Sequence, residues 1–371
     1  MIGKVNVKND IVKSSRKFLR DLMEKKIVDA IIVPLVLDSG RGAHPAFVTN
    51  TSMLDKANPF VPVMPVSTAN EVKRITRLKP SDKKIAVVIR PCDLRNYIEL
   101  IKFKQIDSSN IIIIGTDCYG VHDSELYKDM VDKGKDPFKD YMDLIISNKE
   151  NNLRRACTTC KTPVPNKYAD IIMGFFGTNK KDGILLISQT ENGKNILDEL
   201  KISDIGEVPE REKEVNKLIE TRTKKWNEIK DKTLKEVRGI DNLLKYFDTC
   251  IDCHNCKDQC PICFCKECFW ESPVFEFTPP DYFEWSEKKG AVRLPTDTLF
   301  FHLGRLAHMS TSCTGCGFCE DACPKNIELQ RLFFAVGEET SKVFDYEPGR
   351  NLEEKPPLTT FREEELEEMG E

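Results

Sequence analysis

The chain of 371 residues lacks the segments that mark membrane and secreted proteins. It has no run of 18 or more apolar residues, so we expect no membrane-spanning helix. Its N-terminal stretch carries charges but no apolar core, so we expect no secretory signal. A net charge of −4 gives none of the basic excess that favours binding to nucleic acid. These absences predict a cytoplasmic protein.

Several catalytic signatures are also missing. The sequence contains no Walker loop, no G-x-G-x-x-G and no nucleophile elbow, so ATP hydrolysis, a conventional dinucleotide site and serine hydrolysis have no support. The five histidines show no HExxH spacing. No glycine occurs between Gly3 and Gly40, which leaves the start of the chain without a loop suited to close approach to a phosphate. The catalytic residues are therefore unknown from the sequence.

Cysteine, in contrast, is abundant, with fifteen residues. Eight of them form two runs of the pattern C-x2-C-x2-C-x3-C-P, which is typical of a loop around a [4Fe–4S] cluster. The first three thiolates of a run bind one cluster, and the fourth binds the other cluster of the pair. In a chain without an export signal, metal ligation is a better interpretation than disulfides, and oxygen-sensitive clusters favour an anaerobe. We expect one cluster on Cys250, Cys253, Cys256 and Cys323, and a second on Cys260, Cys313, Cys316 and Cys319.

Short apolar runs rich in β-branched residues predict an α/β domain with a mostly parallel sheet over residues 1–205. The expected strands cover 27–37, 84–89, 111–115, 169–176 and 183–189, and a helix over 67–78 can be N-capped by Ser67. Residues 206–244 predict a helical linker with one apolar stripe. A dicluster ferredoxin-like domain over 245–335 and an acidic tail over 336–371, solvated or ordered by a partner, complete the expected organisation.

Four more cysteines lie in the α/β half. Cys92 and Cys118 each follow a predicted strand, and Cys157 and Cys160 form a C-x2-C pair. Sites in open α/β sheets gather outside the carboxyl ends of the strands, so these thiols could surround one metal centre. Free cysteine is also common in protein interiors, so ordinary buried thiols remain the alternative.

The order of these motifs resembles a known family. The chain reads IRPCDLRN, then IGTDCYG, then CTTC, then ADIIMGFFG, between about residues 10 and 205. This order is similar to the beta subunits of the coenzyme F-420-reducing hydrogenase and F-420-dependent formate dehydrogenase family. The C-terminal dicluster module matches the version of the family found in formate dehydrogenase beta subunits.

The resemblance implies a third [4Fe–4S] cluster on Cys92, Cys118, Cys157 and Cys160, beside an FAD that exchanges a hydride with coenzyme F-420. The alternatives left open are a glycine-containing strand bulge for Gly174 and Gly177, a plain helix cap for Ser67 and a solvent-facing side chain for Arg90. Family members also carry a glycine pair near the N-terminus, which this chain lacks. The candidate flavin contacts are Ser67, Thr68, Asn70, Arg90, Asp170, Gly174 and Gly177.

We therefore expect an oxidoreductase subunit, an iron–sulfur flavoprotein that passes electrons between a flavin and a partner. The expected partners are a formate dehydrogenase alpha or hydrogenase-type catalytic subunit, or heterodisulfide-reductase-like subunits. The rival interpretations are a flavin-free iron–sulfur adaptor and a zinc-structured interaction protein. Cys263, Cys265 and Cys268 have no assigned metal, and packing, alternative ligation and a separate metal all remain open for them.

Overall fold

The computed structural model describes residues 1–179 and 183–361. In this part of the chain, seven strands form one sheet in the order β1-β7-β6-β5-β4-β2-β3. The four central strands β6, β5, β4 and β2 are parallel, and β1, β7 and β3 are added by antiparallel pairing. The predicted α/β class is confirmed, with a mixed sheet. The strands are β1 Ile2–Val5, β2 Ala30–Val36, β3 Ala43–Val48, β4 Ile85–Ile89, β5 Ile111–Thr116, β6 Ile171–Gly174 and β7 Ile184–Ser188.

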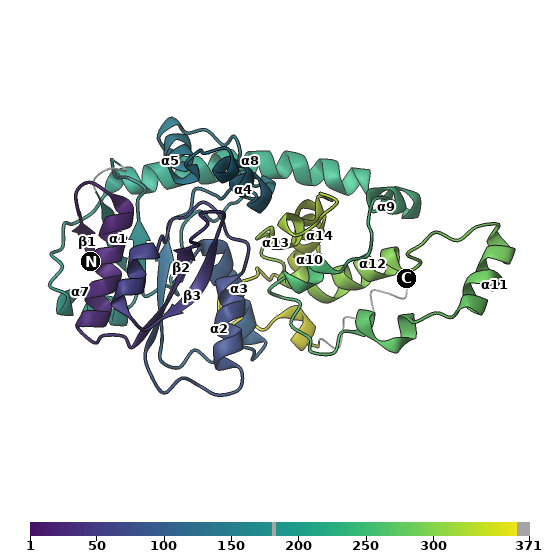
Figure 1. Ribbon diagram of the computed structural model, residues 1–371, viewed down its shortest axis with the longest axis horizontal. Helices are drawn as coiled ribbons and strands as arrows, with labels where there is room; N and C mark the ends of the chain where they lie inside the picture. The colour runs from purple at the N-terminus through teal and green to yellow at the C-terminus, as the bar shows by residue number, and fades with distance from the viewer. Residues whose placement is uncertain (180–182, 362–371) are drawn as a thin grey trace.

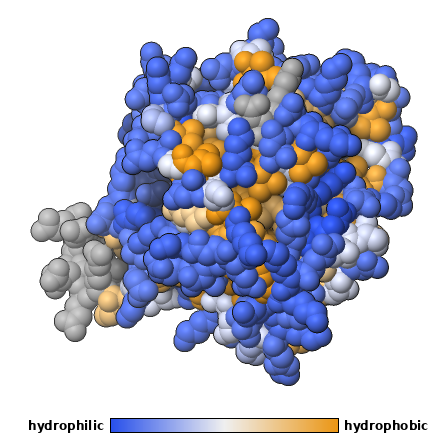
Figure 2. Space-filling view, turned by 90° about the vertical axis from the view of Figure 1, so that its left-hand side faces the viewer, coloured by the Kyte–Doolittle hydropathy of each residue, from blue (hydrophilic) through white to orange (hydrophobic). Residues whose placement is uncertain are grey.

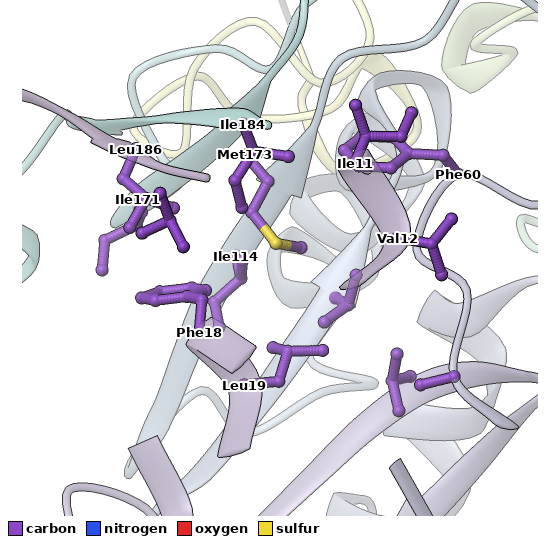
Figure 3. Close-up of a cluster of buried hydrophobic side chains, with 14 of the residues drawn as sticks. Ile11, Val12, Phe18, Leu19, Phe60, Ile114, Ile171, Met173, Ile184 and Leu186 are labelled. Atoms are coloured by element: carbon purple, nitrogen blue, oxygen red, sulfur yellow. The ribbon is translucent and has the colours of Figure 1, made fainter. Parts of the chain in front are cut away.

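Helices cover both faces of the sheet because alternate strand residues point to opposite sides. In β4, Ala86 and Val88 face the core beneath α1, α5 and α7, whereas Ile85, Val87 and Ile89 face α2 and α3. Figure 3 shows the first of these cores, where α1 lies against the sheet. The covering helices are α1 Ile11–Glu24, α2 Thr68–Thr76, α3 Pro91–Lys102, α5 Pro137–Ser147 and α7 Glu191–Glu199.

The five predicted strands and the helix after Ser67 are present, and the Ser67 hydroxyl accepts a hydrogen bond from the Asn70 backbone N–H at 3.2 Å, as an N-cap does. The edge strands β1 and β3 were not predicted. β1 has only four residues, which is too short to give a clear sequence pattern. β3 contains Pro45, and proline argues against a strand in the sequence, although an edge strand tolerates it. Tertiary pairing with β7 and β2 fixes these strands instead.

A long helix, α8 (Pro209–Glu236), joins the two halves of the molecule and runs along the top of Figure 1. The helical linker was predicted to extend to residue 244. In the structure the helix is interrupted before that point, because Gly239 has a φ of 92°, which is outside the helical region. A second helix, α9 (Ile240–Tyr246), follows. The fully buried Trp226 anchors α8 by donating from Nε1 to Glu338 Oε2 at 2.7 Å and by packing on Phe334.

The C-terminal module contains α10 (Asn255–Asp258), α12 (Thr298–Met309), α13 (Phe318–Asp321) and α14 (Leu329–Val343). An arm between the two cysteine runs carries α11 (Pro279–Lys289) and projects to the far right of Figure 1. Its rings contact one another in pairs, such as Phe277 on Trp285, while Phe283 is exposed. The arm lines an open cavity of about 680 Å³.

The acidic tail predicted from residue 336 is different in the structure. Residues 336–343 belong to the buried helix α14, which crosses the predicted boundary. Beyond it, Tyr346 donates to both carboxylate oxygens of Glu99 at 2.6 Å, and the Gly349 N–H donates to Glu99 Oε1 at 2.8 Å. Residues 344–352 therefore form a strap across α3. Residues 362–371, the end of the predicted acidic tail, lie outside the described part of the chain.

The surface of the N-terminal end is mainly hydrophilic, with hydrophobic residues visible between the polar ones toward the middle of the face in Figure 2.

Two further helices, α4 (Ser124–Asp132) and α6 (Arg155–Thr158), lie in the connection between β5 and β6. None of the described helices is both long and apolar enough to cross a membrane.

Candidate metal centres

Four cysteines lie together outside the carboxyl ends of β4 and β5. Cys92 stands in the first turn of α3, Cys118 follows β5, and Cys157 and Cys160 lie in and just after α6. Burial raises the pKa of the Cys92 thiol, and Cys118 and Cys160 add to the rise. Burial also raises the pKa of Cys157 to about 12, where Arg154 opposes the rise and Cys118 and Cys160 add to it. These four thiols are one group, here called the N-terminal group.

Two buried arginines accompany the N-terminal group. Arg90 donates from Nη1 to Cys118 Sγ at 3.3 Å and from Nη2 to the Val61 carbonyl oxygen. Arg154 donates to the Met64 carbonyl oxygen at 3.2 Å. A cluster held by four thiolates carries net negative charge, which buried guanidinium groups can balance. Arg90, predicted to bind a flavin phosphate, is thus already committed to this group.

A second group, here the distal group, is formed by Cys250, Cys253, Cys256 and Cys323. All four line one small cavity of about 20 Å³. Burial raises the pKa of Cys256 to about 11, where Arg305 opposes the rise and the other three thiols add to it. The structure therefore brings together the first three cysteines of one run and the last cysteine of the other.

The remaining predicted ligands form the proximal group, Cys260, Cys313, Cys316 and Cys319. Burial raises the pKa of Cys319 far above its ordinary value, Arg305 opposes the rise, and the other three thiols increase it. Cys260 of the first run thus joins three cysteines of the second run. This exchange of fourth ligands is the arrangement expected for a two-cluster ferredoxin.

The proximal group lies directly against the N-terminal group. Cys92, Cys157 and Cys316 share one buried apolar cluster with Phe318. A Cβ added to Gly317 would come within 2.6 Å of the Ala156 side chain, so the two loops are in close contact. On the other side, Arg305 donates to Cys256 Sγ at 3.0 Å and also faces Cys319. The order in space is N-terminal group, proximal group, distal group.

Hydrogen bonds from α3 hold this junction. Thr314 Oγ1 donates to Asn96 Oδ1 at 2.6 Å, and Arg95 Nη1 donates to the Thr314 carbonyl oxygen at 3.3 Å. The side chain of Asn96 also hydrogen-bonds Cys316, which lowers the pKa of a thiol that burial raises. Residues that follow Cys92 in sequence thus support the proximal group rather than a phosphate.

Histidines on α12 and beside α10 contact the distal group. His302 Nε2 lies 3.4 Å from Cys250 Sγ, and its ring stacks on Phe247. Burial lowers the pKa of His302 to about 3, so the imidazole is neutral. His254 instead stacks on Phe301 and lies 3.4 Å from the Asp252 carboxylate. No sequence pattern had distinguished His302, because it comes from a different segment than the cysteines that it contacts.

The predicted flavin loop after β6 is filled by protein. A Cβ at Gly174 would lie 2.8 Å from the Arg211 guanidinium, and one at Gly177 (φ +74°) would lie 2.4 Å from the Arg211 backbone nitrogen. Arg211 pairs with the buried Asp117 through a 2.6 Å contact from Nη2 to Oδ1. Asp117 also accepts from the Phe175 N–H at 2.8 Å. These glycines therefore admit the start of α8.

The other predicted flavin contacts are not brought together with that loop. Asp170 lies at the amino end of β6, where it accepts from Ile113 N–H at 2.9 Å and Thr190 Oγ1 at 2.7 Å. Ser67, with Thr68 and Asn70 after it, opens α2, and its hydroxyl donates to Asp93 at 2.6 Å. Asp170 and Ser67 therefore fix the local structure of β6 and α2.

The donor sets differ in how well they fit the implied cofactors. Each cysteine group offers four thiolate ligands in an apolar, arginine-balanced setting, which fits a [4Fe–4S] cluster. In the described residues, no three Cys, His, Asp or Glu side chains converge as ligands of one metal ion. The cavity at the ends of β2, β4 and β5, lined by Thr68 and Arg90, measures about 10 Å³, which holds at most about one water molecule. The residues predicted for FAD therefore do not fit a flavin.

Comparisons with known proteins agree with the cysteine geometry. Residues 308–327, which include the second cysteine run, match the 4Fe-4S binding domain family. The beta subunit of an F420-dependent formate dehydrogenase from Methanocaldococcus jannaschii is 29% identical, with 91% of each chain covered. This chain is similar to formate dehydrogenase beta subunits over most of its length. The resemblance predicted from the motifs is confirmed.

A second formate dehydrogenase relative, F420-dependent formate dehydrogenase 1 subunit beta from Methanococcus maripaludis, is also 29% identical, over 91% of this chain and 90% of its own length. A chain of the F420-reducing [NiFe] hydrogenase complex from Methanosarcina barkeri aligns with a TM-score of 0.45 and 16% identity, covering 65% of this chain and 93% of that chain. Both formate dehydrogenase relatives match the chain across the sheet and the C-terminal module.

Proposed function

We propose that the chain is an electron-transfer subunit of a multi-subunit oxidoreductase and carries three [4Fe–4S] clusters in series. The observation that carries this proposal is the packing of Cys92, Cys157 and Cys316 against one buried apolar cluster, which joins the N-terminal and proximal groups. The contact of Arg305 with Cys256, and its position facing Cys319, continues the series to the distal group. The expected ligands of the three clusters are the twelve cysteines of these groups.

The chain's own residues would hold the clusters and set their electron affinity. A bound [4Fe–4S] cluster accepts and releases electrons singly. Arg90, Arg154 and Arg305 place positive charge against the thiolates, and Asn96 and His302 contact sulfur directly. Burial and hydrogen bonds to sulfur are the protein's means of tuning each potential.

The partner is a catalytic subunit of the formate dehydrogenase alpha or hydrogenase type, with heterodisulfide-reductase-like subunits as a further candidate. The names of the two relatives, both beta subunits of formate dehydrogenases, support the first of these. The long helix α8 runs along the top of the molecule and the arm that carries α11 projects from its right-hand end (Figure 1).

The flavin-free adaptor is the form of this function that the geometry supports best. Arg211 fills the glycine loop, and the strand-end cavity is nearly closed. The flavoprotein form, with FAD and coenzyme F-420, is the second candidate, and the F420-dependent names of the relatives favour it.

Anaerobic reconstitution of the full chain tests both forms. Iron, acid-labile sulfide and acid-released flavin are measured together on the purified protein. We expect at least about twelve irons per chain, as three clusters require, and no flavin. A stoichiometric flavin would select the flavoprotein form, and the absence of iron and sulfide would overturn the function itself.

The Cys319→Ser variant tests the series. It is expected to bind about four fewer irons than the parent chain, because one proximal-group ligand is lost. Electrons supplied at the N-terminal group should then no longer reach the distal group, as followed by cluster spectra during reductive titration. Unchanged iron content would contradict the assignment of Cys319.

A further inference from the structure

Three cysteines remain outside the three groups, and the structure places them around one cavity. Cys263, Cys265 and Cys268 all line a space of about 210 Å³. This volume is several times the roughly 30 Å³ that one water molecule occupies in the liquid, so it has room for more than a single ion. The cavity is thus a built feature of the cysteine-rich segment rather than a surface irregularity.

The walls of this cavity come from segments that lie far apart in the chain. Phe103 belongs to the end of α3, and its ring contacts Phe264 at a centroid distance of 5.1 Å. Trp270 comes from the arm, and Leu358 comes from the last described segment of the chain. Apolar walls of this kind limit access of water to a buried redox centre.

The polar lining carries positive charge. Arg305, 3% exposed, lines the cavity, and its Nε has no hydrogen-bond partner within the described residues. Lys257 and His308 line the cavity as well. A set of thiolates around a metal cluster is negatively charged, so the buried Arg305 guanidinium and the Lys257 ammonium group, which also pairs with Asp258 at 3.2 Å, suit that occupant.

The cavity also adjoins two of the cluster groups. The Cys263 backbone N–H donates to the carbonyl oxygen of Cys260, a proximal-group cysteine, at 3.1 Å. Arg305 contacts Cys256 of the distal group while lining this cavity. Cys265 is exposed, so the three thiols connect the interior groups with the molecular surface.

We propose that Cys263, Cys265 and Cys268 hold a fourth [4Fe–4S] cluster, with the His308 imidazole as the remaining donor. Thiolates are the usual protein ligands of such clusters, and histidine replaces cysteine in some iron–sulfur centres. The proposal rests on the proposed function, since this cluster would exchange single electrons with its neighbours. Its position gives the series a branch that ends at the surface.

The test compares iron and sulfide contents of full-length variants after anaerobic reconstitution. The triple variant Cys263→Ser, Cys265→Ser, Cys268→Ser is expected to bind about four fewer irons and four fewer sulfides than the parent chain. Cys265→Ser, which changes one exposed side chain, is expected to show the same loss or a changed cluster spectrum without loss of fold. Lys266→Ser in the same loop is the control and should bind as much iron as the parent.

The outcomes separate this inference from the proposed function. Equal iron in the parent and in both cysteine variants would overturn the fourth cluster and leave the three-cluster series intact. Loss of zinc rather than iron, measured on the same samples, would overturn its identity as an iron–sulfur site. Absence of iron from the parent would overturn the proposed function together with the fourth cluster.

Discussion

Asp117 shows how a single residue decides the meaning of a sequence motif. Its carboxylate is fully buried, accepts backbone hydrogen bonds from Phe175 and Phe176, and is neutralised by Arg211. The sequence indicated that the glycines near these phenylalanines admit something close to the backbone. It could not indicate what, because Arg211 lies 94 residues from Asp117 in the chain.

Replacing Arg211 should be costly. Arg211→Ala leaves the buried Asp117 without its counter-charge, so we expect the free energy of unfolding to fall by about 3–5 kcal/mol. The matched control is Arg41→Ala, which removes an exposed pair with Asp132 and should cost about 0–1 kcal/mol. Urea unfolding of the two variants side by side measures the difference. Equal costs would contradict the role of the pair.

Cysteine spacing was informative at the residue scale because cluster ligation is largely local. Three cysteines of each C-terminal group lie within seven consecutive residues, so the pattern itself predicts the group. The arginines that balance the groups carry no such signal. Arg305 contacts Cys256 from 49 residues away, and only the packing of α12 brings them together.

Elements were predicted where their residues alone specify them. The buried central strands are continuous runs of Ile and Val, as in β4 and β5, and were found. The structure at the end of the chain was not predicted, because the strap of residues 344–352 is fixed by contacts with α3. Its acidic composition suggested a segment exposed to solvent, yet Tyr346 and Gly349 donate hydrogen bonds to the buried carboxylate of Glu99.

The strap can be tested with two glycines of nearly the same backbone conformation. Gly349 has φ +73° and a Cβ there would lie 2.4 Å from the Arg95 Cβ, whereas Gly206 has φ +75° and open space around it. Gly206→Ala should cost about 1–2 kcal/mol of backbone strain. Gly349→Ala should cost a further 1–3 kcal/mol, roughly, from overpacking against α3.

Thermal or urea unfolding measures this difference, and limited proteolysis after residue 343 reports on the strap itself. The Gly349→Ala variant is expected to be cut faster in this segment than the Gly206→Ala variant. Identical stability and identical cleavage would show that the strap does not bind α3 as described.

The whole molecule depends on the contact between the sheet domain and the cluster module. Arg154 is buried and pairs with Asp321 of α13 at 2.7 Å, and Ser124 of α4 donates to the same carboxylate at 2.6 Å. Arg155 adds a second pair with Glu320. These contacts hold the proximal group against the N-terminal group, so the proposed electron-transfer series depends on them.

Asp321→Asn should weaken this contact. The substitution removes the carboxylate that pairs directly with the buried Arg154, and we expect a loss of about 3–5 kcal/mol in the free energy of unfolding. Glu328→Gln serves as a control at the same boundary, because its pairs with Arg155 and Arg331 are partly exposed and should each contribute about 0–1 kcal/mol. A similar loss in both variants would contradict a buried anchor at Asp321.

The strap also has a consequence for the order in which the protein is made. Glu99 is buried against groups that follow it by up to 250 residues. At a synthesis rate of about 5–20 residues per second, the ribosome needs roughly 10 to 50 seconds to supply Gly349 after Glu99. During that interval α3, which carries Cys92, has no strap across it. The buried Glu99 therefore gains its hydrogen bonds from Tyr346 and Gly349 only when synthesis of the chain is nearly complete.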